Sequence, residues 1–90
     1  MEKDKKELLK DKLKGKFAIL IRTKRGELGK SQEDFAADLL MCDRAISYVE
    51  NHEKLISTTT LFTLLAKNII TLADIENILS EIKTIVEEEK

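Results

Sequence analysis

Near the middle of the chain, Ser47 and Tyr48 lie three and four residues after Arg44, and all three side chains are polar. In a helix this spacing places them on one face, and the apolar residues between them fall on the opposite face. An arginine offers a planar fork of N–H donors, and the two hydroxyl groups both donate and accept hydrogen bonds. The pattern predicts a helix over residues 43–51 with one face that can form hydrogen bonds. This face binds a partner or, as the alternative, only contacts solvent.

The other residues capable of chemistry do not form a catalytic or metal-binding pattern. His52 is the one histidine, the serines have no base at a recognisable spacing, and no glycine-rich loop could hold a phosphate. Cys42 is the one cysteine, so it cannot form an internal disulfide, and no second ligand lies at metal-binding spacing from it. We therefore expect no enzymatic activity, no metal, no cofactor and a cytoplasmic location.

Length and composition indicate a single helical domain. The chain has 90 residues, no proline, three glycines and 37% charged residues, which is typical of an all-α protein with one compact core. The longest apolar runs, such as residues 17–21, are far too short to span a bilayer, and the charged N-terminus lacks the apolar region of a signal peptide. We expect a soluble protein with no membrane partner.

Apolar periodicity and capping residues predict five helices. The first covers residues 3–25, where Gly15 makes the part before it a frayed extension or a separate short helix, and Gly26 and Gly29 bracket the turn that follows. Ser31 caps a second helix that stops near Met41. The third covers residues 43–51, and the fourth ends near residue 68.

Further side chains are expected to cap these helices or to lie in the core. Thr59 and Thr60 are predicted as caps of the fourth helix, and Thr71 as the cap of the last one. The apolar stripe of the second helix includes Leu40, and the fourth helix is expected to be largely core. Its apolar residues are Leu61, Phe62, Leu64 and Leu65.

The last helix carries apolar residues at alternating steps of three and four, as the seam of a coiled coil does. The residues of this seam are Ile75, Ile78, Ile82 and Ile85. We predict a homodimer through it, with packing against the N-terminal extension as the alternative. The expected organisation is a charged extension over residues 1–13, a central domain over 14–70, and a C-terminal dimerisation helix over 71–90.

Charges are segregated along the chain although its net charge is −1. Residues 1–30 contain eleven Lys or Arg and five Asp or Glu, a net of +6, whereas residues 71–90 have a net of −4. One end could thus approach a polyanion such as DNA while the other end avoids it. The alternative is that these charges are simply the solvated faces of helices.

The segment Ser31-Gln32-Glu33-Asp34-Phe35-Ala36, followed after nine residues by Ile46-Ser47-Tyr48-Val49-Glu50-Asn51, resembles the helix-turn-helix signature of the phage repressor/Cro-like (XRE) family. The resemblance covers about residues 14–70. It implies a compact five-helix, lambda-repressor-like fold, here with an extended C-terminal helix. It also implies a transcription regulator, expected to be a repressor, that binds double-stranded DNA as a dimer. The alternative is an antitoxin or another protein-interaction module that uses the same domain and binds a partner protein.

The resemblance also implies roles for individual residues. The helix over 43–51 would enter the major groove, with base contacts from Asp43, Arg44, Ser47 and Tyr48. Arg44 is the strongest candidate, and capping is the favoured alternative for Asp43. Phosphate contacts would come from Gln32, Asn51, Lys54 and Lys30. Arg25 and Glu50 match positions that form a partly buried ion pair in the family.

Four residues depart from the family pattern, and one of them is Lys30, which replaces a usual hydrophobe. Leu40 stands where the family has glycine in the turn between its two defining helices, and His52 replaces the glycine after the second of them. A branched side chain resists the left-handed conformation usual at the first position, so we expect that turn to differ locally or to be strained. Cys42 replaces the usual Ser or Thr cap, which leaves Asp43 as the expected cap.

Overall fold

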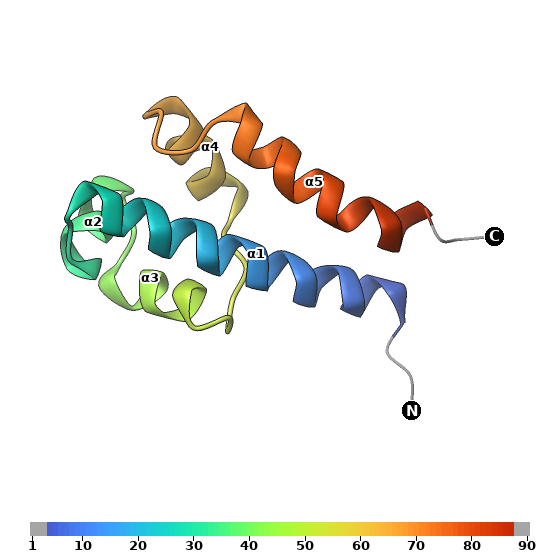
Figure 1. Ribbon diagram of the computed structural model, residues 1–90. Coiled ribbons are helices and arrows are strands. Elements are labelled where there is room, and N and C mark those ends of the chain that lie inside the picture. Colours follow the sequence, from blue (N-terminus) through green and yellow to red (C-terminus); the bar gives the residue numbers. More distant parts are fainter. Residues whose placement is uncertain (1–3, 88–90) are drawn as a thin grey trace.

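The computed structural model describes residues 4–87, and in this range the chain forms five α-helices and no strand, which confirms the all-α prediction (Figure 1). Residues 1–3 of the expected extension and 88–90 of the expected last helix lie outside the described residues. The helices are α1 (Lys5–Leu28), α2 (Gln32–Asp38), α3 (Asp43–Glu50), α4 (Thr58–Ala66) and α5 (Leu72–Glu87).

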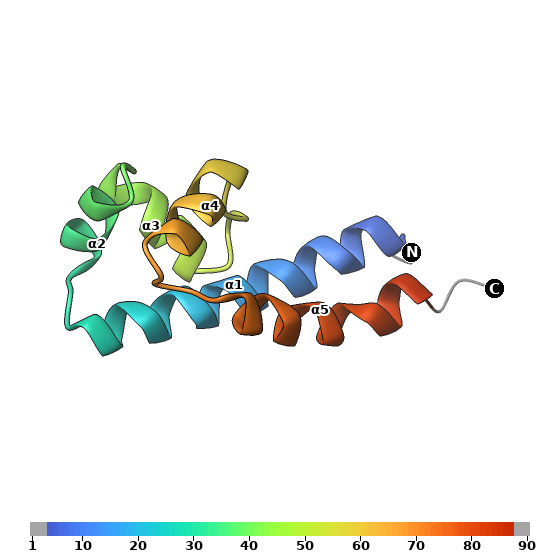
Figure 2. The same ribbon diagram turned by 90° about the horizontal axis from the view of Figure 1, so that it is seen from above.

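The two long helices, α1 and α5, lie side by side and run in opposite directions, so that the start of α1 and the end of α5 lie at the same end of the molecule (Figures 1 and 2). Helices α2 and α3 pack against each other, and α3 also packs against α1. The three short helices gather around the C-terminal half of α1, and the paired ends of α1 and α5 project beyond them. The molecule is accordingly elongated, with extents of 44 × 28 × 20 Å.

Helix α1 is continuous, so the predicted break at Gly15 and the predicted turn at Gly26 are both wrong. Asp4 caps its start by accepting a hydrogen bond from the backbone N–H of Glu7, and Gly29 ends it at a φ of 66°. A glycine inside a helix costs about 1 kcal/mol relative to alanine. Packing of the apolar face of α1, which is buried at Phe17 and Ile21, outweighs that cost.

Two of the predicted helix caps are confirmed. Ser31 accepts a hydrogen bond from the backbone N–H of Asp34, 3.1 Å away. Thr71 and Asp74 cap α5 reciprocally, because each side chain accepts a hydrogen bond from the other residue's backbone N–H.

The predicted caps of α3 and α4 are wrong. Ser57, and neither Thr59 nor Thr60, caps α4. Cys42 occupies the N-cap of α3 without a side-chain hydrogen bond, and Asp43 is the first residue inside that helix. One side-chain cap predicted for α3 is therefore missing.

The hydrophobic core lies where α1, α2, α3 and α4 converge. It is built around Phe35, which is fully buried, together with Ile21, Ala36, Leu39, Ile46, Val49, Leu64 and Ile70. The predicted inward face of α3 is confirmed, because Ile46 and Val49 are buried while Arg44 and Tyr48 are exposed. This core fixes the position and rotation of α3 relative to the other helices.

Leu40 and Phe62 were expected in the core, and the structure places both at the surface, with 89% and 62% exposure. Helix α2 ends at Asp38, three residues earlier than predicted, and Leu40 then adopts a φ of 59°. This left-handed residue turns the chain and directs the leucine away from the core. The strain predicted for the turn is therefore present, since a residue with a Cβ pays about 1–2 kcal/mol in this conformation.

We expect Leu40→Gly to raise the melting temperature by about 4–8 °C, which corresponds to a gain of about 1 kcal/mol in the free energy of unfolding. The gain comes from removal of the Cβ at a positive φ, reduced by the greater freedom of glycine in the unfolded chain. Thermal unfolding followed by circular dichroism measures it. Leu40→Ala is the matched control, because it shortens the same exposed side chain and keeps the Cβ. Equal melting temperatures for the glycine and alanine variants would contradict the assignment of strain.

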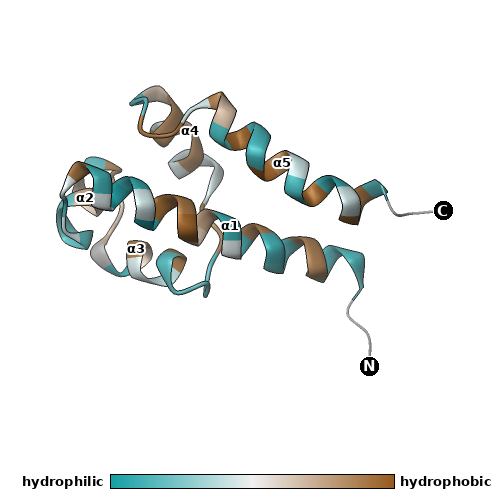
Figure 3. Cartoon of the chain, in the orientation of Figure 1, coloured by the Kyte–Doolittle hydropathy of each residue, from teal (hydrophilic) through white to brown (hydrophobic). Residues whose placement is uncertain are grey.

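The predicted dimer seam on α5 already packs within the single chain. Ile78 is buried, Ile75 packs against the core, and Ile82 and Ile85 are half-buried on the helix that lies along α1. The N-terminal extension, which the sequence offered as the alternative partner, is described from residue 4 and continues into α1. The homodimer stays a prediction. Figure 3 shows apolar and polar residues alternating along α5. The exposed apolar residues of this helix are instead Leu72, Leu79 and Val86.

Candidate nucleic-acid interface

The carboxylate of Glu50, at the C-terminal end of α3, joins three helices. Arg25 of α1 binds it through two parallel hydrogen bonds, with Nε 2.7 Å from Oε2 and Nη2 3.0 Å from Oε1. Gln32 of α2 donates to the same Oε1 through Nε2 at 2.9 Å. Arg22 adds a bond of 3.0 Å to the backbone carbonyl of Glu50. The predicted Arg25–Glu50 pair therefore forms, and it fixes the end of α3 to α1 and α2.

Glu50 has only 2% exposure, so burial penalises its charged form. The hydrogen bonds from Arg25 and Gln32 and the positive charges of Arg25 and Arg22 outweigh that penalty, and the pKa of the Glu50 carboxyl lies below its ordinary value. The same hydrogen bond raises the pKa of Arg25 above its ordinary value. Glu50 is thus held as a carboxylate, and Arg25 as its cation, at neutral pH.

This lowered pKa predicts a loss of stability in acid. The unfolded chain takes up a proton at Glu50 at a higher pH than the folded chain does, so the stabilisation is complete above the ordinary glutamate pKa. It is lost as the pH falls through the lower pKa of the folded state. Urea unfolding between pH 7 and pH 3 measures this slope. We expect Glu50→Gln to be less stable at neutral pH and to show a shallower loss in acid; an equally steep loss would contradict the role of Glu50.

The predicted base-reading residues lie on the solvent-facing side of α3. Arg44 and Tyr48 are exposed, and Ser47 is half-buried and accepts a hydrogen bond from Nδ2 of Asn51 at 3.3 Å. The ammonium group of Lys54 lies 5.4 Å from the centroid of the Tyr48 ring, in reach of a cation–π interaction. Asp43 begins α3. The structure therefore brings Arg44, Ser47 and Tyr48 to one surface, as their spacing predicted.

The four predicted phosphate-binding residues are not equally available. Asn51 and Lys54 lie at the surface next to the exposed face of α3. The Gln32 side chain instead donates to Glu50, and Lys30 forms an ion pair with Asp38. The role of Gln32 as a second donor to a buried carboxylate was missed in the sequence, because its partner is eighteen residues away and only the fold brings them together. All four phosphate contacts remain predictions.

The basic and acidic ends of the sequence do not form separate ends of the molecule. Because α1 and α5 are antiparallel neighbours, Lys16 lies 3.4 Å and Lys12 4.0 Å from a carboxylate oxygen of Glu81. Lys24 lies 3.6 Å from Asp74, whose pKa is lowered by the backbone hydrogen bond from Thr71 and by this cation. The idea that one end approaches a polyanion while the other avoids it is therefore wrong.

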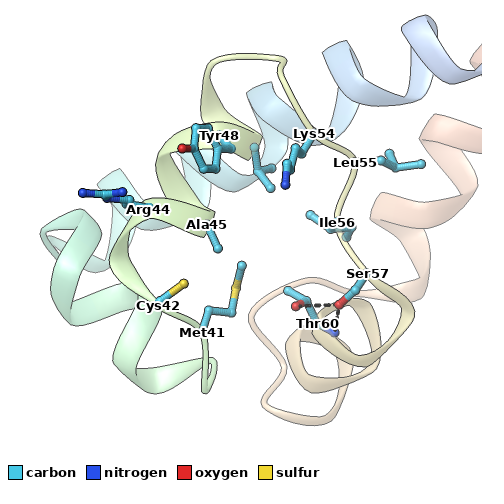
Figure 4. A pocket seen from close by; sticks show the side chains of 11 residues that line it. Met41, Cys42, Arg44, Ala45, Tyr48, Lys54, Leu55, Ile56, Ser57 and Thr60 are labelled. Atoms are coloured by element: carbon cyan, nitrogen blue, oxygen red, sulfur yellow. Dashed lines mark hydrogen bonds between the residues drawn. The ribbon is translucent and has the colours of Figure 1, made fainter.

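A pocket of about 550 Å³ opens beside the exposed face of α3 (Figure 4). One wall is α3 itself, and the other is the segment that leads from α3 into α4. Its described lining residues are Met41, Cys42, Arg44, Ala45, Tyr48, Val49, Lys54, Leu55, Ile56, Ser57 and Thr60. No sequence signal pointed to this pocket, because it depends on how α3 and α4 diverge.

No group of three His, Cys, Asp or Glu side chains within residues 4–87 is arranged to hold a metal ion. In the same range, none of the helices is long and apolar enough to cross a lipid bilayer. Comparison of the chain with protein-family models, with curated proteins and with solved structures found no match. The resemblance to the phage repressor/Cro-like family stays a prediction drawn from the motif residues.

Proposed function

We propose that this chain is a sequence-specific DNA-binding regulator of transcription, acting in the cytoplasm as a repressor, which inserts α3 into the major groove. The observation that carries the proposal is the solvent-facing side of α3, where Arg44 and Tyr48 are exposed and Ser47 is half-buried. The end of this helix is anchored by Arg25 and Glu50. An α-helix fits the major groove, and a rigid support is what lets short polar side chains read base edges. Arg44 pairs with guanine in this proposal, and Ser47 and Tyr48 contact neighbouring bases or sugar-phosphate.

A single helix of this length reads only a few base pairs, so the proposal includes a homodimer that reads two half-sites about one helical turn apart. With Ile75 and Ile78 used inside the single chain, the apolar contact between subunits would come from Leu72, Leu79 and Val86, which recur every seven residues. Sedimentation of the purified chain measures whether the dimer forms.

The experiment that tests DNA binding is selection of duplexes from a random pool by the purified chain, repeated at two salt concentrations. We expect one preferred sequence, with an affinity that falls as the salt concentration rises, because bound cations are released from phosphates. Tyr48 is the one tyrosine of a chain without tryptophan, so its fluorescence reports binding directly at α3. Recovery of a random pool at both salt concentrations would refute the proposal.

A second candidate is a protein-interaction module, such as an antitoxin, and the charge of the interface favours it. Residues 30–54 contain three Lys or Arg and six Asp or Glu. Without Glu50, which is buried and paired with Arg25, three cations and five anions leave a net of −2. Such a surface gains less from approaching phosphate than a basic surface does. Co-purification of a stoichiometric basic partner, together with failure of the duplex selection, would support this candidate over the first.

A further inference from the structure

The pocket beside α3 has the size of a small-molecule site. Its volume of about 550 Å³ falls within the roughly 300–1,000 Å³ typical of ligand pockets, which are mostly apolar with a few polar groups. Met41, Ala45 and Ile56 supply apolar surface, and Figure 4 shows them around the hollow between α3 and the segment leading to α4. The volume and the lining of this pocket both suit a small molecule.

The charged residues in the described lining of the pocket are both cations. Its described lining residues include two cations, Arg44 and Lys54, and no carboxylate. Lys54 extends over the ring of Tyr48 at one end. At the other end, Ser57 and Thr60 already satisfy each other, because the Ser57 hydroxyl donates to Thr60 Oγ1 at 3.0 Å and accepts from the Thr60 backbone N–H. The pocket therefore offers a positive charge at one end of an apolar surface.

We propose that this pocket binds a small amphipathic carboxylate, with its apolar body against Met41, Ala45 and Ile56 and its carboxylate at Lys54. The complementarity is between one negative charge and the cation at the rim, and between the remaining carbon chain and the apolar lining. Arg44 and Tyr48 belong both to this pocket and to the proposed DNA-reading face. A carboxylate in the pocket therefore changes the affinity for operator DNA. This consequence rests on the proposed function, but the binding of the carboxylate itself does not depend on it.

Two natural reporters allow the test without DNA. Tyr48 is the one tyrosine and Cys42 the one cysteine of the chain, and both line the pocket. Octanoate, octanol and octylammonium are titrated below their micelle concentrations, with Tyr48 fluorescence and the rate of Cys42 thiol labelling as readouts. We expect octanoate to give a saturable fluorescence change and to protect Cys42, with an affinity roughly fivefold above that of octanol, as one exposed charge pair allows. No saturation, or equal affinity for all three probes, would overturn the proposal.

Substitution of the cation separates charge recognition from apolar binding. Lys54→Gln is expected to remove the preference for octanoate over octanol. The fluorescence and labelling rate of each variant are compared with those of the same variant without ligand. Lys67→Gln is the matched control, because Lys67 is an exposed lysine at the end of α4 that is not among the described pocket residues. If Lys54→Gln keeps the full preference, the assignment is wrong. A chain that binds octanoate but selects no duplex would refute the DNA proposal and leave this one standing.

Discussion

Arg25→Ala is expected to lower the free energy of unfolding by about 3–5 kcal/mol, the usual cost of removing one partner of a buried ion pair. The Glu50 carboxylate would stay buried, at 2% exposure, and would keep only the hydrogen bond from Gln32 to its side chain. A domain of this length is stable by about 5–13 kcal/mol in total, so the loss threatens folding itself. Urea or thermal unfolding measures it.

Lys12→Ala is the matched control for Arg25→Ala. Lys12 also lies on α1 and near a carboxylate, but its distance to Glu81 is 4.0 Å and both side chains are more than 40% exposed. Removing such a surface pair costs about 0–1 kcal/mol. If Arg25→Ala unfolds at the same urea concentration as Lys12→Ala, the Arg25–Glu50 pair does not hold the three helices together.

A double replacement separates two contributions to the free energy of unfolding: the loss caused by leaving one buried charge unpaired, and the net stabilisation by the ion pair itself. Arg25→Met combined with Glu50→Met removes both charges and leaves two side chains of suitable length in the same place. We expect this variant to be more stable than either single replacement. Gln32 would then be released from Glu50, which it contacts in the parent. A double variant that loses the sum of both single losses would show that the two charges act independently.

The second large effect concerns DNA recognition, and it follows from the proposed function. Arg44→Ala should weaken binding to the selected duplex by about 1–3 kcal/mol, or roughly 5- to 150-fold, and should relax sequence preference at one position. Arg44 is exposed on α3, so its removal should leave the melting temperature unchanged. Competition between the selected duplex and single-base variants measures the effect.

Arg44→Lys is the control that separates geometry from charge. Lysine keeps the positive charge and loses the planar fork that pairs with guanine at two atoms. We expect the lysine variant to retain the salt dependence of the parent and to lose most of its preference at that base. If Arg44→Lys keeps the sequence preference of the parent, Arg44 acts by attracting phosphates. If Arg44→Ala also keeps that preference, Arg44 is not part of the DNA interface.

The amino-acid sequence by itself determined what depends on short-range spacing. Steps of three and four residues placed Ile46 and Val49 inside and Arg44 and Tyr48 outside, and the structure has them there. The caps at Ser31 and Thr71 form because a hydroxyl group reaches a backbone N–H within the same turn of helix. The Arg25–Glu50 pair was predicted from the resemblance, and the hydrogen bonds of the structure confirm it.

The tertiary structure decided what depends on how distant segments meet. Gly15 stays helical because a long apolar face of α1 is packed, and local propensity cannot register that packing. Leu40 leaves the core because the turn into α3 requires a left-handed residue at that point. Lysines of the basic segment pair with carboxylates of the acidic segment because α1 and α5 run antiparallel. The spacing of apolar residues predicts which face of a helix is buried, but only tertiary packing decides which neighbouring helix covers that face.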